Sequence, residues 1–290
     1  MTTVHSISPS NGSGTPASSD CPTVRLIPDP RETLTGQRRR RALERSLRYT
    51  MPFVVMLFWQ LASTQKWLDP QYFPSPTTIW SASIDLWENG RLPDAIIDTS
   101  WRTIQGFVWG SLVGLVLGVV MGASRLVRLA FEPVMYAFWT IPKLAILPLL
   151  LLIFGFGDTP QIILIVLNTL FLVLIPTMAA IASVSDAYRE TGHSFGASRA
   201  QMFRHILLPS AVPEIFVALR LSAGASILVA VAAEFVNGNT GLGYMIWNSW
   251  QVFLPEPMYV GIVVVAILGA AFTLLIAALG RRIAPWAKGM

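Results

Sequence analysis

The sequence predicts an all-α integral membrane protein with about six transmembrane helices. Of its 290 residues, 53% are hydrophobic and only 13% are charged, about half the charged fraction of an average soluble domain. The apolar residues gather in long blocks, each near the length that a helix needs to cross about 30 Å of hydrocarbon. The charged residues fall mainly between these blocks, as expected for helices surrounded by lipid.

The N-terminal region is polar and then strongly basic. Residues 1–37 are rich in Ser, Thr, Pro and Gly, a composition typical of disorder. No small-residue cleavage site follows Trp59, so the pattern indicates a helix start held at the cytoplasmic face rather than a signal peptide. We therefore expect a disordered basic cytoplasmic tail over 1–48 and a transmembrane domain over 49–285. The arginines before the first apolar block are Arg38, Arg39, Arg40, Arg41, Arg45 and Arg48.

The apolar blocks define the expected spans and their orientation. Most of the remaining arginine falls in connections that lie on the same side as the N-terminus, so the positive-inside rule places both termini in the cytoplasm. This placement explains the net charge of +5 without any binding of nucleic acid, and the lipid bilayer is the expected surrounding. Between the first two spans, residues 74–98 are polar to amphipathic, which allows a short helix lying on the outer surface but favours an ordinary helix of the extracellular loop. The six expected spans are residues 49–66, 101–123, 132–154, 161–183, 212–236 and 258–280.

The second span carries a glycine every fourth residue. Residues four apart lie on one face of a helix, so this face has almost no side chains and another helix can approach it closely. The spacing leaves three interpretations open: static packing inside one subunit, a sliding contact, or a dimer contact. The glycines are Gly106, Gly110, Gly114, Gly118 and Gly122.

Lys143 and Glu234 are charged residues inside the predicted spans, where each costs about 2.5–3.5 kcal/mol. Lys143 follows Pro142, which can open a kink, and a cation there could attract an anionic solute. Glu234, near the outer end of the fifth span, could serve as a gate, as a hydrogen-bond anchor for a loop, or as a residue that reaches the interface. The structural alternative for both is a partner buried in the bundle or reach to the interface.

The connection at 184–211 is too polar to span a membrane and too patterned to be a linker. A short helix is expected from Asp186 to Phe195, stopped by Gly196. Ser198 is placed to cap a second helix with Gln201 as its reciprocal partner. Phe195 and Phe203 are expected to be exposed, and such an apolar patch rimmed by charge usually docks another molecule. Pro209 and Pro213 are expected to break the chain before the fifth span.

Residues 190–198, which read E-T-G-H-S-F-G-A-S, resemble the E-A-A coupling loop of bacterial ABC importer permeases. The resemblance extends over about 50–285, and further motifs are similar to the nitrate, sulfonate and taurine branch. One departure is Thr191-Gly192, where the family usually has Ala-Ala; Gly192 weakens the first short helix by about 1 kcal/mol. The branch motifs lie at 73–76, 141–145, 154–157 and 241–247.

The resemblance implies a type I importer permease fold in a bacterial cytoplasmic membrane, with residues 49–285 forming a multi-pass permease domain. It also implies a homodimer, two cytoplasmic ATPase subunits bound through the coupling loop, and an extracytoplasmic binding protein that delivers a small anion. The fold implies a pathway near Ser222 and Ser226, together with Lys143 and Glu234. The residues assigned to ATPase coupling are Glu190, Phe195, Gly196, Ala197, Gln201, Phe203, Arg204 and Pro209.

Two other function classes were weighed. An intramembrane enzyme is disfavoured because the sequence has no G-x-x-x-x-G-K-[ST] or H-E-x-x-H motif. A self-sufficient channel or secondary carrier is disfavoured because no inverted repeat is evident. The chain is therefore expected to have no catalytic residue, no metal site and no bound cofactor, with ATP and Mg²⁺ held by the partner ATPase.

Overall fold

A computed structural model describes residues 50–286, and every regular element among them is a helix, as the sequence predicts. The tail expected over 1–48 lies outside the described residues. The chain divides into two units, Met1–Val55 and Met56–Met290. A helix over Thr50–Thr64 crosses that boundary, and all the longer described helices lie in the second unit.

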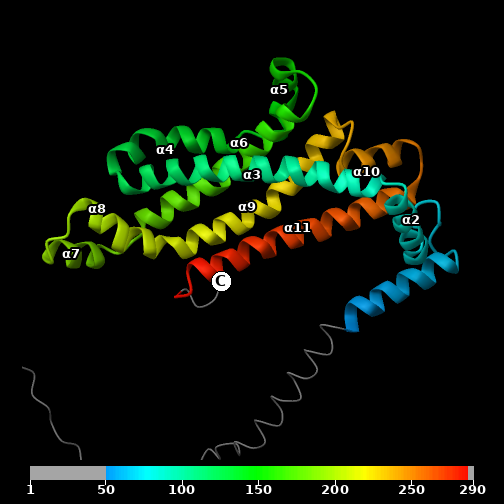
Figure 1. Ribbon diagram of the computed structural model, residues 1–290, viewed down its shortest axis with the longest axis horizontal. Coiled ribbons are helices and arrows are strands. Elements are labelled where there is room, and N and C mark those ends of the chain that lie inside the picture. The colour runs from blue at the N-terminus through cyan, green and yellow to red at the C-terminus, as the bar shows by residue number, and fades with distance from the viewer. Residues whose placement is uncertain (1–49, 287–290) are drawn as a thin grey trace, which may run out of the picture. The chain divides into compact units, whose positions relative to one another are not determined.

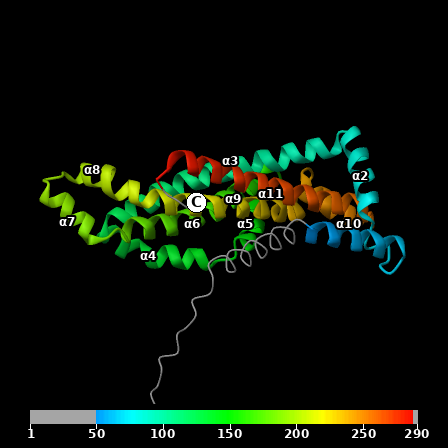
Figure 2. The ribbon, with the colours of Figure 1, turned by 90° about the horizontal axis from the view of Figure 1, so that it is seen from below.

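Four helices of this unit are long and apolar enough to cross a membrane, with the residues before α9 counted as part of its helix. Three of them match the predicted spans closely, whereas α3 begins ten residues before the predicted start at residue 101. The four helices run side by side in both views of the ribbon (Figures 1 and 2). They are α3 (Arg91–Ala123), α6 (Asp158–Ala182), α9 (Leu208–Asn237) and α11 (Pro255–Ile283).

The predicted continuous span at 132–154 is wrong. The chain instead forms α4 (Arg125–Thr140), a 3₁₀ turn η1 (Lys143–Ile146) and α5 (Leu147–Phe154), with a bend of 84° at the break. The cause is local, because a proline disfavours helical backbone at the residue before it. Ile141 accordingly has extended backbone, with φ −66° and ψ 127°.

Among residues 50–286, four helices could span a membrane, or five if the bent pair is counted as one span, against about six predicted. The first predicted span, 49–66, begins outside the described residues, and its described part forms the helix Thr50–Thr64.

Shorter helices lie at the two ends of the long ones (Figure 1). The expected amphipathic helix within 74–98 is α2 (Pro76–Glu88), near α10 (Leu242–Gln251). Helix α10 lies in the connection between the predicted spans at 212–236 and 258–280. At the opposite end lie α7 (Asp186–Ser194) and α8 (Arg199–Met202).

The glycine stripe of α3 lies against α6 of the same chain. A Cβ atom at Gly106 would lie 2.5 Å from the Cβ of Ile165, and one at Gly114 would lie 2.6 Å from the carbonyl oxygen of Leu170. Contacts this short are possible only without side chains, so the two backbones approach closely. The partner of the glycine stripe is therefore a helix of the same chain, so this contact is packing inside one subunit.

Candidate functional site

The coupling loop at one end of the bundle is built by two helix caps. Helix α7 ends at Ser194, and the chain turns at Gly196, whose positive φ of 70° suits a residue without a Cβ. The N–H of Ala197 donates to the carbonyl of Gly192 (3.0 Å), the hydrogen bond that typically closes a helix ended by glycine. The predicted stop at Gly196 is therefore where the chain turns.

The second cap opens α8. The Gln201 N–H donates to the hydroxyl of Ser198 (3.3 Å), and the Ser198 N–H donates to Oε1 of Gln201 (2.8 Å). The reciprocal pair expected from the sequence is thus formed. The pair fixes the direction in which the chain enters α8, and the role of Gln201 in the loop is therefore to cap this helix.

Helix α8 continues without a break into α9 through a π-helical segment, η2 (Phe203–Leu207), so one helix covers Arg199–Asn237. The expectation that Pro209 and Pro213 break the chain is wrong. The Leu208 N–H bonds the Phe203 carbonyl, five residues back. The wider turn accommodates Pro209, which has no N–H to donate.

Gly192 allows close packing between α7 and the helical segments that follow it, although glycine has a low helix propensity. Helix α7 forms in full around it, and a Cβ at this position would lie 2.5 Å from Cε of Met202 and 2.8 Å from Cδ1 of Ile206. Gly192 and Met202 are both buried. The glycine therefore lets α7 lie directly on α8 and η2, which makes the two short helices one rigid unit.

The outer face of this unit carries exposed aromatic and charged groups. Phe195 is 86% exposed and Tyr188 is 62% exposed, whereas Phe203 is half-buried. Glu190 and Arg204 are exposed. The exposed aromatic pair is therefore Tyr188 and Phe195; the sequence argument missed Tyr188 because it lies before the E-A-A motif.

A buried polar cluster lies at the opposite end of the bundle. Arg102 of α3 bonds Glu234 of α9 (Nη1 to Oε1, 2.8 Å) and Asp158 of α6 (Nε to Oδ1, 2.7 Å). Arg102 and Glu234 are buried, while the side chain of Asp158 is 56% exposed. Arg102 also donates to the carbonyl and hydroxyl oxygens of Thr240. One guanidinium thus ties three long helices to the turn that follows α9.

Glu234 also organises the start of α10. Its carboxylate accepts from the Gly243 N–H (2.7 Å) and from the Thr99 hydroxyl (2.9 Å), and Thr99 in turn accepts from the Leu242 N–H (2.8 Å). Side chains at Gly241 or Gly243 would collide with Glu234. These hydrogen bonds favour one of the interpretations given for Glu234, a hydrogen-bond anchor for a loop.

Lys143 caps the end of α4 at the break between α4 and α5. Its ammonium group donates to three carbonyls at the end of α4, those of Phe138, Trp139 and Ile141 (2.9, 2.9 and 2.8 Å). It also lies 5.0 Å from the ring centre of Phe171. All three N–H bonds are used, which favours the structural alternative for this residue.

The two serines expected along the pathway are buried inside the chain. Ser222 donates to the Leu219 carbonyl (3.0 Å) and Ser226 to the Ala223 carbonyl (2.8 Å), both within α9. Neither hydroxyl faces a surface that a solute could reach in this conformation. Together with the bonds of Lys143 and Glu234, this placement favours structural roles for the four predicted pathway residues.

A bundle of helices this long and apolar is the architecture of a membrane-spanning protein. The chain belongs to the family of binding-protein-dependent transport system inner membrane components, which matches residues 110–285. It is 31% identical over 219 residues to a putative aliphatic sulfonates transport permease of Escherichia coli K12, covering 76% of this chain and 83% of the relative. It is 31% identical over 241 residues to the taurine transport system permease of the same organism, covering 80% and 86%.

A solved structure supports the same fold. A bacterial ABC transporter involved in the import of alginate is similar with a TM-score of 0.60 and 18% identity, over 87% of this chain and 96% of that chain. The predicted fold class and family are confirmed. The chain is a membrane-spanning permease subunit of an ATP-driven importer, which selects the first of the three function classes weighed above.

Proposed function

We propose that this permease imports a small anion of the sulfonate, taurine, nitrate or carboxylate class, delivered by an extracytoplasmic binding protein. Two copies of the chain form the pathway, and two cytoplasmic ATPase subunits drive it, so the chain itself binds no ATP, Mg²⁺ or other cofactor. The relatives named above, which carry sulfonates and taurine by name, support the class of solute. The positive-inside rule supports a bacterial cytoplasmic membrane location with both termini in the cytoplasm.

The observation that carries the coupling role is the exposed, rigid face of α7. Phe195 at 86% exposure offers an apolar grip, and Tyr188 adds a second ring. Glu190 and Arg204 supply polar contacts beside them. The caps at Gly196, Ala197 and Gln201 keep the loop rigid enough to transmit force.

The path by which force reaches the membrane is the continuous helix of 39 residues from Arg199 to Asn237. At 1.5 Å per residue it is about 58 Å long. Phe203 begins the π-helical segment near its start, and Pro209 lies in the first turn of α9 after that segment. The Arg102–Glu234 pair lies at its far end. A displacement of α8 by an ATPase would therefore move α9 as one body and act on α10 through Glu234.

The test is recovery of the ATPase with the permease. Phe195→Asp should abolish co-purification of the ATPase subunits while leaving the amount of permease in the membrane unchanged. The matched control is Trp67→Asp, which changes an equally exposed aromatic residue (72%) outside the loop. Equal recovery of ATPase with both variants would refute the coupling role.

A further inference from the structure

A groove runs between α9 and α11 and belongs to neither the coupling loop nor the polar cluster. It has a volume of about 670 Å³. Its floor is made of small residues, so the two helices leave a hollow between the larger side chains at its rim. The small residues of the floor are Gly224, Ala266, Gly269 and Ala270.

The groove has the length of one leaflet of the bilayer. Its lining on α11 extends from Ile262 to Leu274, twelve residues apart, which is about 18 Å along a helix. One leaflet supplies about half of the 30 Å hydrocarbon core. The length of one acyl chain therefore matches the groove.

A single cation stands at one end of the groove. Arg220 is exposed and is the only charged residue in the lining. Within residues 50–286 it makes no hydrogen bond or ion pair. It lies 17 residues before Asn237, so it is about 26 Å from the outer end of α9 and near the boundary on the coupling-loop side. A charge there needs an anionic partner or reach to the interface.

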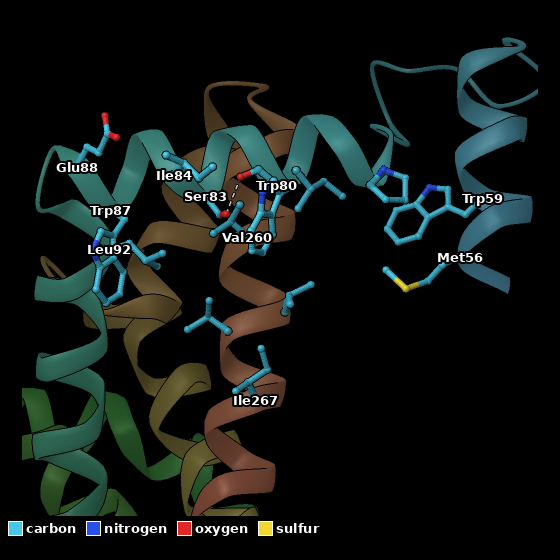
Figure 3. Close-up of a pocket in the computed structure, with 14 residues that line it drawn as sticks. Met56, Trp59, Trp80, Ser83, Ile84, Trp87, Glu88, Leu92, Val260 and Ile267 are labelled. Atoms are coloured by element: carbon cyan, nitrogen blue, oxygen red, sulfur yellow. Dashed lines mark hydrogen bonds between the residues drawn. The ribbon is translucent and has the colours of Figure 1, made fainter. Parts of the chain in front are cut away.

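A second groove differs from the first in the charge of its lining. It has a volume of about 490 Å³ and is lined by residues of α2, α11 and the neighbouring helices, among them Trp80, Trp87 and Val260 (Figure 3). Its only charged lining residue is Glu88, an anion. That groove is apolar enough for an acyl chain but offers no group that attracts a phosphate.

We propose that the groove between α9 and α11 binds an anionic phospholipid of the leaflet on the coupling-loop side. The guanidinium of Arg220 binds the phosphate, because its planar fork matches phosphate oxygens. One acyl chain lies over Gly224 and Gly269 and ends near Ile262. This site adds a lipid ligand to the permease and does not depend on the identity of the transported solute.

The experiment measures lipid bound to the full chain in detergent, by native mass spectrometry with equal dioleoylphosphatidylglycerol and dioleoylphosphatidylcholine. The wild type should retain the anionic lipid preferentially. Arg220→Gln should lower that preference about fivefold, the effect expected for one basic group near anionic lipid. Arg125→Gln removes an exposed arginine outside the groove at the start of α4 and should leave the preference unchanged.

A filling variant tests the groove separately from the charge. A Cβ at Gly269 would meet no atom within 4 Å, so Gly269→Leu fills the hollow without disturbing the fold. It should release bound lipid of both kinds while the protein elutes as the same species.

Three outcomes would overturn the proposal. The first is an unchanged lipid preference in Arg220→Gln, or unchanged lipid content in Gly269→Leu. The second is efficient disulfide formation between two Gly269→Cys chains in membranes, which would make the groove an interface between copies. The third is displacement of the lipid by millimolar taurine, which would assign the groove to the solute pathway.

Discussion

Replacing Arg102 by methionine removes the buried cation that Glu234 faces. The side chain of Glu234 is fully buried, and Arg102 is its only charged partner among the described residues. Leaving one partner of a buried ion pair alone costs about 3–5 kcal/mol. For a protein of this size, each kcal/mol corresponds to about 2–4 °C in melting temperature, so the variant should melt roughly 6–20 °C below the wild type.

The assay is thermal unfolding of the detergent-purified chain, with a double variant and a surface control. Arg102→Met with Glu234→Met should cost less than the sum of the two single changes by at least about 1.5 kcal/mol, because neither charge is left alone. Asp158→Asn alters the 56% exposed partner and should cost under about 1 kcal/mol. Melting of Arg102→Met within 2 °C of the wild type, or simple additivity in the double variant, would refute the reasoning.

Three further changes test the packing and the break. Gly114→Leu forces a side chain against a backbone carbonyl of α6 and should destabilise the chain by about 3 kcal/mol or more in thermal unfolding. The control Val116→Leu, on an exposed face of α3, should leave the melting temperature unchanged. Gly192→Leu should separate α7 from α8 and cut ATPase co-purification severalfold, with permease abundance unchanged; full recovery would contradict the packing described. Lys143→Met should lower the free energy of unfolding by about 1–3 kcal/mol, because three carbonyls lose their hydrogen-bond donor. The solute concentration for half-maximal uptake should stay unchanged. A large rise in that concentration would instead show that Lys143 contacts the solute.

The features that the sequence predicts correctly are local ones. The capping pair at Ser198 and Gln201 and the stop at Gly196 depend on residues within one or two turns of each other. The glycine stripe is also local, since its period alone puts the glycines on one face. Its partner α6 is not encoded in that period, which is why three interpretations stayed open.

The features that the sequence argument missed depend on distant residues. Arg102 finds its partners 56 and 132 positions away, so nothing near it in the chain marks it as buried. The break at Ile141 is an exception, because its signal in Pro142 is local and Lys143 bonds carbonyls of Phe138, Trp139 and Ile141 in the same stretch. The uninterrupted passage through Pro209 needs a π-helical turn, which no simple periodicity predicts.

The most direct test of the coupling account is photo-cross-linking in native membranes. A photoreactive phenylalanine analogue at Phe195 should form a covalent adduct with the ATPase subunit, because this ring is the most exposed aromatic group of the loop. The same analogue at Trp67, outside the loop, should form none. Adducts of equal yield at both positions, or adducts at Phe195 with lipid alone, would contradict the claim that this loop grips the ATPase.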